Sequence, residues 1–262
     1  MALAPLLELI AKGKLYDLGQ PYFVGMPHHP AHPPFLFGLS KKHGDIVIQG
    51  GASSAAEVLT LGGHVGTHID GLAHFSRDGK LHGGVEADSV QSYGGGFRKL
   101  SIDTVAPILR RGVLADVAGL VGVDELPPDF TVTPEHLEAA CRAPVSAGDV
   151  VLLRTGWARY WEDPQRYLGR GAGPGPQEEG GRWLSARGVF AVGSDTIAFE
   201  RVPSPSMPVH VHLLVENGIH ILEALNLEVM ARDGVREFLF LAAPLKIRGG
   251  TGSPIRPFAL AW

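Results

Sequence analysis

Short apolar runs separated by glycine and proline recur along the chain and predict β-strands. Valine, isoleucine, leucine and phenylalanine dominate these runs, as is typical of strands. The predicted strands are 14–18, 57–61, 112–116, 150–153, 189–193, 220–225 and 238–242.

Helices are fewer than strands. The clearest runs from Thr133, whose hydroxyl can cap a helix with Pro134 at its first position, to Cys141. Further helices are predicted over 177–187 and 207–216, and a short packing helix over 1–10. The Gly/Pro-rich stretch 169–176 predicts a flexible loop. Because similar strands lie on both sides of it, we expect one domain over 1–262.

Composition narrows the class of protein. The chain has 262 residues, of which 45% are hydrophobic and 19% charged, and this predicts an ordered globular protein. A net charge of -4 gives no basic surface for nucleic acid, and no apolar run is long enough to span a membrane. The N-terminus lacks the features of a signal peptide, and a single cysteine fits a reducing compartment. We therefore expect a cytoplasmic protein.

The densest chemistry lies between Gly63 and His74. Its donors are His64, His68, Asp70 and His74. In a strand, side chains alternate between two faces, so these even positions all lie on one face. In a helix, Asp70 would point about 240° away from His64. The spacing therefore predicts a strand as far as Asp70, and the glycine that follows allows a bend that turns His74 inward.

Two imidazoles and a carboxylate suit Zn, Mn or Fe, and three protein ligands with open positions are typical of catalytic sites. A closed structural zinc site usually needs thiolates, and the chain has one cysteine. The alternative, hydrogen-bonded core or surface histidines, is common for a lone histidine but not for four donors in phase. We therefore expect a metal site.

A second, weaker cluster contains His210, His212 and Glu223. The two histidines share a face of a strand but not of a helix. Glu223 ends the apolar run 219–222, where an unpaired carboxylate would be costly to bury and a cation would relieve that cost. A helix with solvated histidines, followed by a strand ending at the surface, is the alternative that the periodicity leaves open.

The segment from His64 to His74 resembles the HxGTHxDxxxH signature of the cyclase family of metal-dependent hydrolases, which includes bacterial kynurenine formamidases and isatin hydrolases. Further segments follow the family's order, so the resemblance covers nearly the whole chain. They are 16–21, 26–27, 151–157, 192–196, 221–225 and 243–246.

The resemblance implies a compact α/β fold, a swivelling β/β/α-type domain with a mixed β core and peripheral helices. It implies that His64, His68 and Asp70 hold one divalent metal ion, Mn²⁺ or Zn²⁺, with Glu223 as a further ligand. His74 would donate and accept the proton. The family usually assembles as homodimers or homotetramers.

Two departures from the formamidase pattern point to the isatin hydrolase branch. Formamidases carry a His-His pair in the later cluster. Aligning His212 with its second member puts Val211 at a ligand position, which implies a single metal, although His210 could substitute if the backbone shifts by one residue. His29 stands about where formamidases carry a substrate-contacting tryptophan.

We therefore predict a metal-dependent amidohydrolase that cleaves a cyclic amide or an N-acyl aromatic amine. His29, Phe35 and His212 are the candidate substrate contacts, and Phe23, Phe37 and the prolines of 27–34 could add an apolar wall. An arylformamidase acting on N-formylkynurenine is the alternative within the family. A non-haem iron oxygenase or a metal-binding protein without chemistry are the alternatives outside it.

Overall fold

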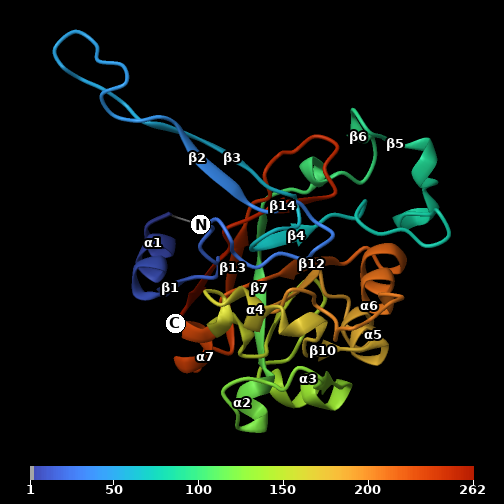
Figure 1. Ribbon diagram of the computed structural model, residues 1–262. Coiled ribbons are helices and arrows are strands. Elements are labelled where there is room, and N and C mark those ends of the chain that lie inside the picture. The colour runs from blue at the N-terminus through green and yellow to red at the C-terminus, as the bar shows by residue number, and fades with distance from the viewer. Residues whose placement is uncertain (1–2) are drawn as a thin grey trace.

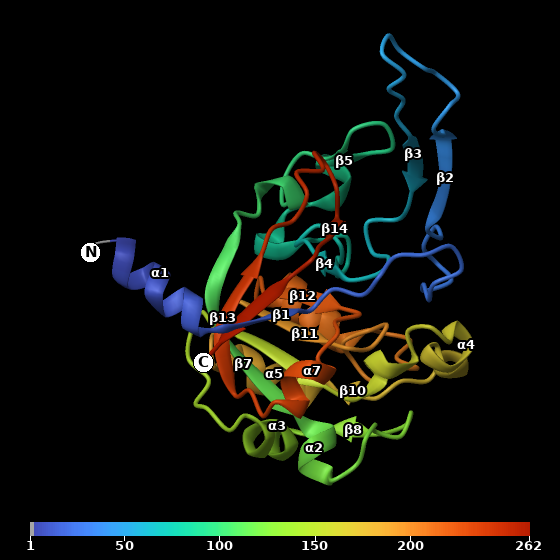
Figure 2. The same cartoon turned by 90° about the vertical axis from the view of Figure 1, so that its left-hand side faces the viewer.

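The computed structural model describes residues 3–262, and its core is a curled, nine-stranded mixed sheet (Figures 1 and 2). The strand order is β1-β15-β13-β7-β9-β11-β12-β4-β14. These strands are β1 (Lys14–Asp17), β15 (Phe258–Ala261), β13 (Glu237–Ala242), β7 (Ile108–Asp116), β9 (Val150–Arg154), β11 (Ala191–Ser194), β12 (His220–Glu223), β4 (His68–Asp70) and β14 (Gly252–Pro254).

The centre of the sheet is parallel and buried on both faces. Strands β7, β9, β11 and β12 run parallel, whereas β4 and β14 pair antiparallel at one side. Alternate residues of β9 enter two separate cores: Leu152 packs in one and Val151 in the other. Such two-sided burial explains why the central strands read as continuous apolar runs.

Helices cover these two cores. Helices α2 (Val117–Val121), α3 (Pro134–Ala140), α5 (Glu178–Ala186) and α6 (Pro208–His210) contribute to the core that contains Val151, and α7 (Glu228–Arg232) contributes to the other. Thr133 caps α3 as predicted. The fold also contains α1 (Leu3–Lys12), α4 (Pro164–Tyr167) and the strand pairs β5 (Gln91–Ser92) with β6 (Gly96–Phe97) and β8 (Thr131–Val132) with β10 (Gly175–Pro176).

A long β-hairpin projects from the body (Figures 1 and 2). Its strands, β2 (Leu36–Lys41) and β3 (Ala56–Thr60), pair only with each other among the described residues. We call residues 36–60 the arm. Only its second strand was predicted, as 57–61.

The seven predicted strands are all present, but other details differ. The strand predicted through His64 is wrong before β4, because Gly66 adopts a φ of 70° and breaks the extended backbone. The stretch 169–176 contains an ordered pairing of β10 with β8 rather than a plain flexible loop. The N-terminal helix forms, but Leu3, Leu7, Leu9 and Ile10 are exposed, so these residues do not pack on the chain's own core. Residues 1 and 2 of that prediction lie outside the described residues.

The sequence also predicted the fold class and the number of domains. The α/β class is confirmed, whereas the single-domain organisation stays a prediction. Among residues 3–262, no helix is both long and apolar enough to cross a bilayer.

Candidate metal centre

The loop before β4 is held in place by two hydroxyl groups. The Tyr22 hydroxyl donates to the Thr67 carbonyl at 2.7 Å, and the Thr67 hydroxyl donates to the Ala224 carbonyl at 2.6 Å. At Gly66 only glycine fits, since a Cβ would lie 2.0 Å from the Tyr22 ring. Because this loop joins His64 to His68, these contacts fix the spacing of the first two imidazoles.

Thr251 and Gly252 contact the His64 ring and fix its orientation. Its Nε2 lies 2.8 Å from the Thr251 hydroxyl, and its Nδ1 lies 2.6 Å from Asp70 Oδ1. The ring also rests on Gly252, where a Cβ would come within 2.4 Å of His64 Cε1. When Nε2 donates its hydrogen to Thr251, Nδ1 is left with a free lone pair facing Asp70.

His68 is oriented in the same way by its own loop. Its Nδ1 donates to the Gly66 carbonyl at 2.8 Å. Its Nε2 therefore faces two carboxylates, 3.5 Å from Asp70 Oδ1 and 3.4 Å from Glu223 Oε2. Ligand atoms around one tetrahedral zinc are separated by similar distances, about 3.4 Å for bonds of 2.1 Å.

His210, rather than His212, enters this cluster. Its Nδ1 lies 2.6 Å from Glu200 Oε2, and its Nε2 lies 3.2 Å from Glu223 Oε1 and 3.9 Å from Asp70 Oδ2. The segment is helical through 208–210 and continues as a π-helical stretch, so positions two residues apart point in different directions. The alternative of solvated histidines is wrong, because both are buried.

His212 belongs to a separate network. Its Nε2 lies 2.8 Å from the Ser185 hydroxyl, and its Nδ1 lies 2.7 Å from Glu216 Oε2. With both ring nitrogens occupied in this way, His212 ties α5 to the helical segment. The structure therefore does not bring this predicted substrate contact into the donor cluster.

His74 lies on the solvent side of the cluster. Its ring stacks on His64 with centroids 3.7 Å apart, and its Nε2 is 4.0 Å from Asp70 Oδ1. Burial lowers the pKa of His74 to about 3, outweighing the opposite effect of Asp70. This imidazole is therefore neutral near pH 7 and can accept a proton.

The electrostatics of the cluster call for a cation. Burial alone would raise the pKa of Asp70 and of Glu223, yet the neighbouring imidazoles hold both pKa values below normal, that of Glu223 at about 2. Hydrogen bonds to Glu200 and Glu223 raise the pKa of His210 to about 10 against its desolvation. The carboxylates thus favour positive charge beside them.

The donor set fits a divalent metal ion. Asp70 Oδ2 is buried and has no hydrogen-bond partner among the described residues. Three inward imidazole nitrogens surround Asp70 and Glu223, and this mixture of nitrogen and oxygen donors suits Zn or Mn. A buried carboxylate oxygen without a partner is costly, and a cation would satisfy it.

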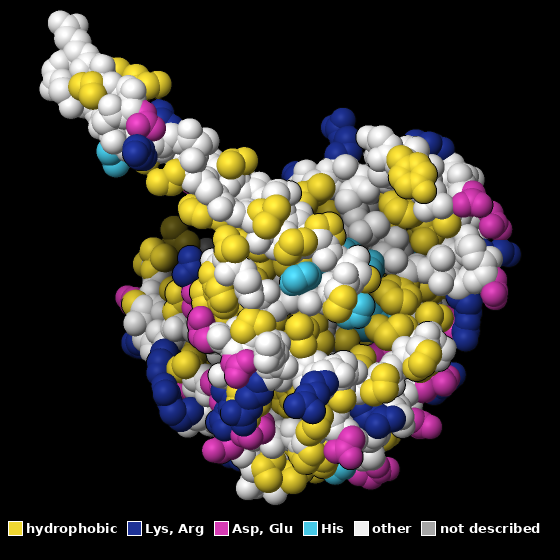
Figure 3. All heavy atoms as spheres, in the orientation of Figure 1, with side chains coloured by type: hydrophobic (Ala, Val, Ile, Leu, Met, Phe, Trp, Pro, Cys, Tyr) yellow, Lys and Arg dark blue, Asp and Glu magenta, His cyan; other side chains and the backbone are white. Residues whose placement is uncertain are grey.

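The other predicted substrate contacts lie outside the cluster. His29 is exposed, and its ring is tilted by 59° against His32, with centroids 5.8 Å apart. His32, which sequence reasoning missed, stacks on His64 with centroids 5.2 Å apart. Phe35 is buried against Tyr22 behind the loop. Histidine side chains are visible in a hollow below the arm (Figure 3).

The fold and the donor set define an α/β protein with a candidate metal centre. A family model described as putative cyclase matches residues 16–201. The chain belongs to the cyclase family.

Relatives and solved structures agree with this assignment. The isatin hydrolase of Roseibium aggregatum is 28% identical over 212 residues, 77% of this chain and 73% of the relative. The kynurenine formamidase of Bacillus cereus is 28% identical over 243 residues, 92% of this chain and 94% of the relative. Isatin hydrolase A from Ralstonia solanacearum matches with a TM-score of 0.77 and 28% identity, covering 100% of this chain and 98% of that one. A crystal structure described as a novel cyclase matches with a TM-score of 0.88 and 29% identity, covering 98% and 89%.

These findings confirm the predicted family, the fold class and the enzyme class, a hydrolase of carbon–nitrogen bonds other than peptide bonds. The relatives are hydrolases by name, so they favour hydrolysis over the oxygenase alternative and over a binding protein without chemistry.

Proposed function

We propose that this chain is a metal-dependent amidohydrolase of the isatin hydrolase kind, which cleaves a cyclic amide or an N-acyl aromatic amine. One observation carries the proposal. The ring nitrogens of His64, His68 and His210 turn toward Asp70, whose Oδ2 lacks any partner among residues 3–262.

We propose that His64, His68 and Asp70 hold a divalent cation, Mn²⁺ or Zn²⁺, with Glu223 as a further ligand. Such a cation, when bound, lowers the pKa of a water molecule and polarises a carbonyl group. The imidazoles of His64, His68 and His210 are oriented through the ring nitrogens that face away from the cluster. These nitrogens contact Thr251, Gly66 and Glu200, respectively.

His74 is the proposed acid and base. Its neutral ring takes a proton from the attacking water as the carbon–oxygen bond forms, and then returns it to the leaving nitrogen as the carbon–nitrogen bond breaks. Asp70, 4.0 Å from His74 Nε2, stabilises the imidazolium in between. His32, which stacks over His64, replaces His29 as the proposed substrate contact.

The position of His210 beside Asp70 raises the question of how many metal ions each chain binds. Asp70 offers Oδ1 beside His64 and Oδ2 beside His210, so one carboxylate serves two groups of donors. The sequence predicts one ion. Metal content of the wild type and of His210→Ala decides this: a fall from two ions to one assigns His210 to a second ion, and one ion in both proteins supports the original count.

A hydrolysis screen tests the function. Purified protein reloaded with Mn²⁺ or Zn²⁺ is assayed with isatin, N-formylkynurenine, dihydropyrimidine-like cyclic amides and simple lactones. Metal-dependent opening of a cyclic amide supports the proposal. Cleavage of only N-formylkynurenine would favour the arylformamidase alternative, and oxygen consumption without hydrolysis would favour the oxygenase.

A further inference from the structure

A second cavity, which we call the rear cavity, lies where β7, β11 and β12 begin. Its volume is about 320 Å³, and His220, the first residue of β12, is one of its lining residues. Along β12 the side chains alternate between the two cores, with Ile221 in one and Leu222 in the other. His220 therefore lies on the opposite face of the sheet from Glu223, which faces the metal centre.

The His220 ring brings one unpaired nitrogen to the rear cavity. The residue is 6% exposed, and its Nδ1 donates to the Asp70 carbonyl at 2.9 Å. Because a carbonyl oxygen only accepts, Nδ1 carries the hydrogen, and in the neutral ring, which burial favours, Nε2 keeps a lone pair. Within residues 3–262 no group forms a hydrogen bond with Nε2, and this atom is not fully enclosed as Asp70 Oδ2 is. The rear cavity therefore offers a hydrogen-bond acceptor to a ligand.

The other walls of the rear cavity are mainly apolar. They include Leu72, Leu100, Val105, Ala106, Ile108 and Phe190. Of the described residues that line it, only Arg110 carries a permanent charge. Arg110 is exposed, and its Cζ lies 3.9 Å from the centroid of the Phe190 ring. Apolar walls around one placed polar group are typical of small-molecule sites, in which the polar group sets the orientation of the ligand.

We propose that the rear cavity is a second ligand site, which binds a small aromatic alcohol or aromatic amine. The hydroxyl or amino group donates its hydrogen to His220 Nε2, and the aromatic ring packs against Phe190 and the aliphatic walls. The size agrees, since an apolar cavity of about 150 Å³ already holds benzene. A carboxylate fits poorly, because it has no hydrogen to donate to Nε2. This inference does not depend on the proposed reaction.

Fluorine NMR of the full-length protein with two matched probes tests the proposal. 4-Fluorophenol carries the donor, and 4-fluorotoluene replaces its hydroxyl with a methyl group. We expect saturable binding of 4-fluorophenol to the wild type. His220→Leu should weaken this binding about 2- to 10-fold, the value of one hydrogen bond, without weakening the binding of 4-fluorotoluene. Absence of saturable binding to the wild type, or an equal loss of both probes in His220→Leu, would overturn the proposal.

A second variant locates the bound probe even if His220→Leu does not fold. Ala106→Trp places a large ring at the exposed rim of the rear cavity and should abolish binding of both probes. Leu109→Trp changes a neighbour that is 64% exposed and does not line the cavity, so it should bind 4-fluorophenol like the wild type. A chelator should leave the affinity unchanged, because the probe does not contact the metal centre. Binding that persists in Ala106→Trp, or that is lost with the metal, would place the probe elsewhere and overturn the proposal.

Discussion

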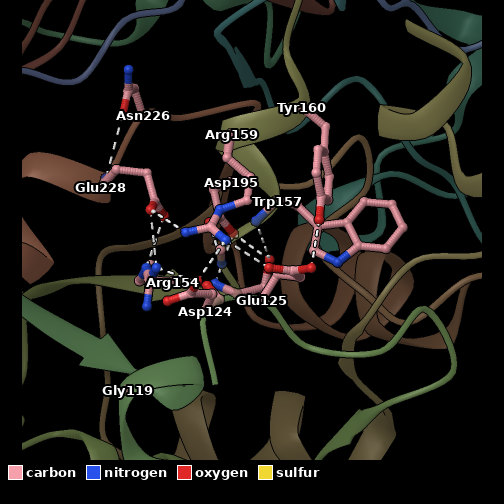
Figure 4. Close-up of polar contacts among 12 residues, drawn as sticks. Gly119, Asp124, Glu125, Arg154, Trp157, Arg159, Tyr160, Asp195, Asn226 and Glu228 are labelled. Carbon is pink, nitrogen blue, oxygen red and sulfur yellow. Dashed lines mark hydrogen bonds and ion pairs between the residues drawn. The ribbon is translucent and has the colours of Figure 1, made fainter. Parts of the chain in front are cut away.

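Two buried polar clusters of this protein differ in whether the chain completes them. The first surrounds Arg154 at the end of β9 (Figure 4). Its guanidinium donates to Glu228 at 2.8 Å, to Asp116 at 3.1 Å and to the Asp124 carbonyl at 2.9 Å. Neighbouring Asp195 accepts hydrogen bonds from the backbone and hydroxyl of Thr155 and from the Gly156 backbone. Each of these charges is satisfied by the protein itself.

The second cluster is the candidate metal centre, and it stays open. The imidazoles of His64, His68 and His210 are held on their outer sides, and their inner nitrogens contact the carboxylates of Asp70 and Glu223, but Asp70 Oδ2 has no hydrogen-bond partner among the described residues. A buried polar network normally satisfies its members, because an unpaired group costs about 1–3 kcal/mol. The partnerless Asp70 Oδ2 therefore distinguishes the second cluster from the first and supports the proposal that a cation binds there.

Removing the shared carboxylate should give the largest effect. Asp70→Ala deletes the group that faces all three inward imidazoles, so the variant should purify without stoichiometric metal and without measurable hydrolysis. Elemental analysis measures the metal. Asp116→Ala, from the closed cluster, is the matched control and should keep its metal. Full metal content in Asp70→Ala would contradict the proposed ligand role.

A variant of His74 should separate proton transfer from metal binding. His74→Ala should lower turnover by about 10²- to 10⁴-fold, because a positioned acid and base is lost, while metal content remains near that of the wild type. Steady-state rates with metal-saturated protein measure the effect. Unchanged turnover would remove His74 from the proposed mechanism.

The outer support of an imidazole should matter less than a ligand. Thr251→Val removes the hydroxyl that fixes His64 Nε2 but keeps the side-chain shape, and should weaken metal binding about 10- to 100-fold. Competition with a chelator measures the affinity without any assay of activity. Thr251→Ser retains the hydroxyl and should bind almost as well as the wild type. Equal affinity in both variants would show that the hydroxyl does not tune the centre.

The sequence predicted local parts of this architecture better than distant ones. The period of two correctly brought His68 and Asp70 onto one face, and the apolar runs located the seven predicted strands. His64 reaches the cluster through a glycine turn instead, a geometry that alternation cannot reveal. Thr251 contacts His64, which is 187 residues away in sequence, so only the paired strands show its role.

The later cluster illustrates a second limit. Whether His210 or His212 enters the site depends on the direction that each side chain takes from a helical segment, and a shift of one residue puts His210 where the alignment places Val211. The alignment therefore favoured Val211 at the ligand position, whereas the structure brings His210, the alternative, to the cluster. Nothing in the pattern of residues 36–60 distinguishes an extended arm from a packed hairpin either, since exposure is a property of the tertiary structure.

The closed cluster should affect stability rather than catalysis, and its effect should be the smallest. Burial raises the pKa of Asp195 to about 6, although its hydrogen bonds with Thr155 and Gly156 oppose the shift. Between the unfolded pKa near 3.8 and the folded value, the native state keeps a proton that the unfolded chain has lost. The contribution of Asp195 to the free energy of unfolding is therefore fully present below about pH 4 and decreases as the pH rises through 6.

Asp195→Asn should lower the free energy of unfolding by about 1–2 kcal/mol at pH 7, because an amide cannot accept all these hydrogen bonds. Urea unfolding at several pH values should show that this cost is larger at pH 4 than at pH 7, with metal content unchanged. A cost that is constant with pH would mean that Asp195 does not titrate in this window, and a loss of metal would mean that the two clusters are not independent.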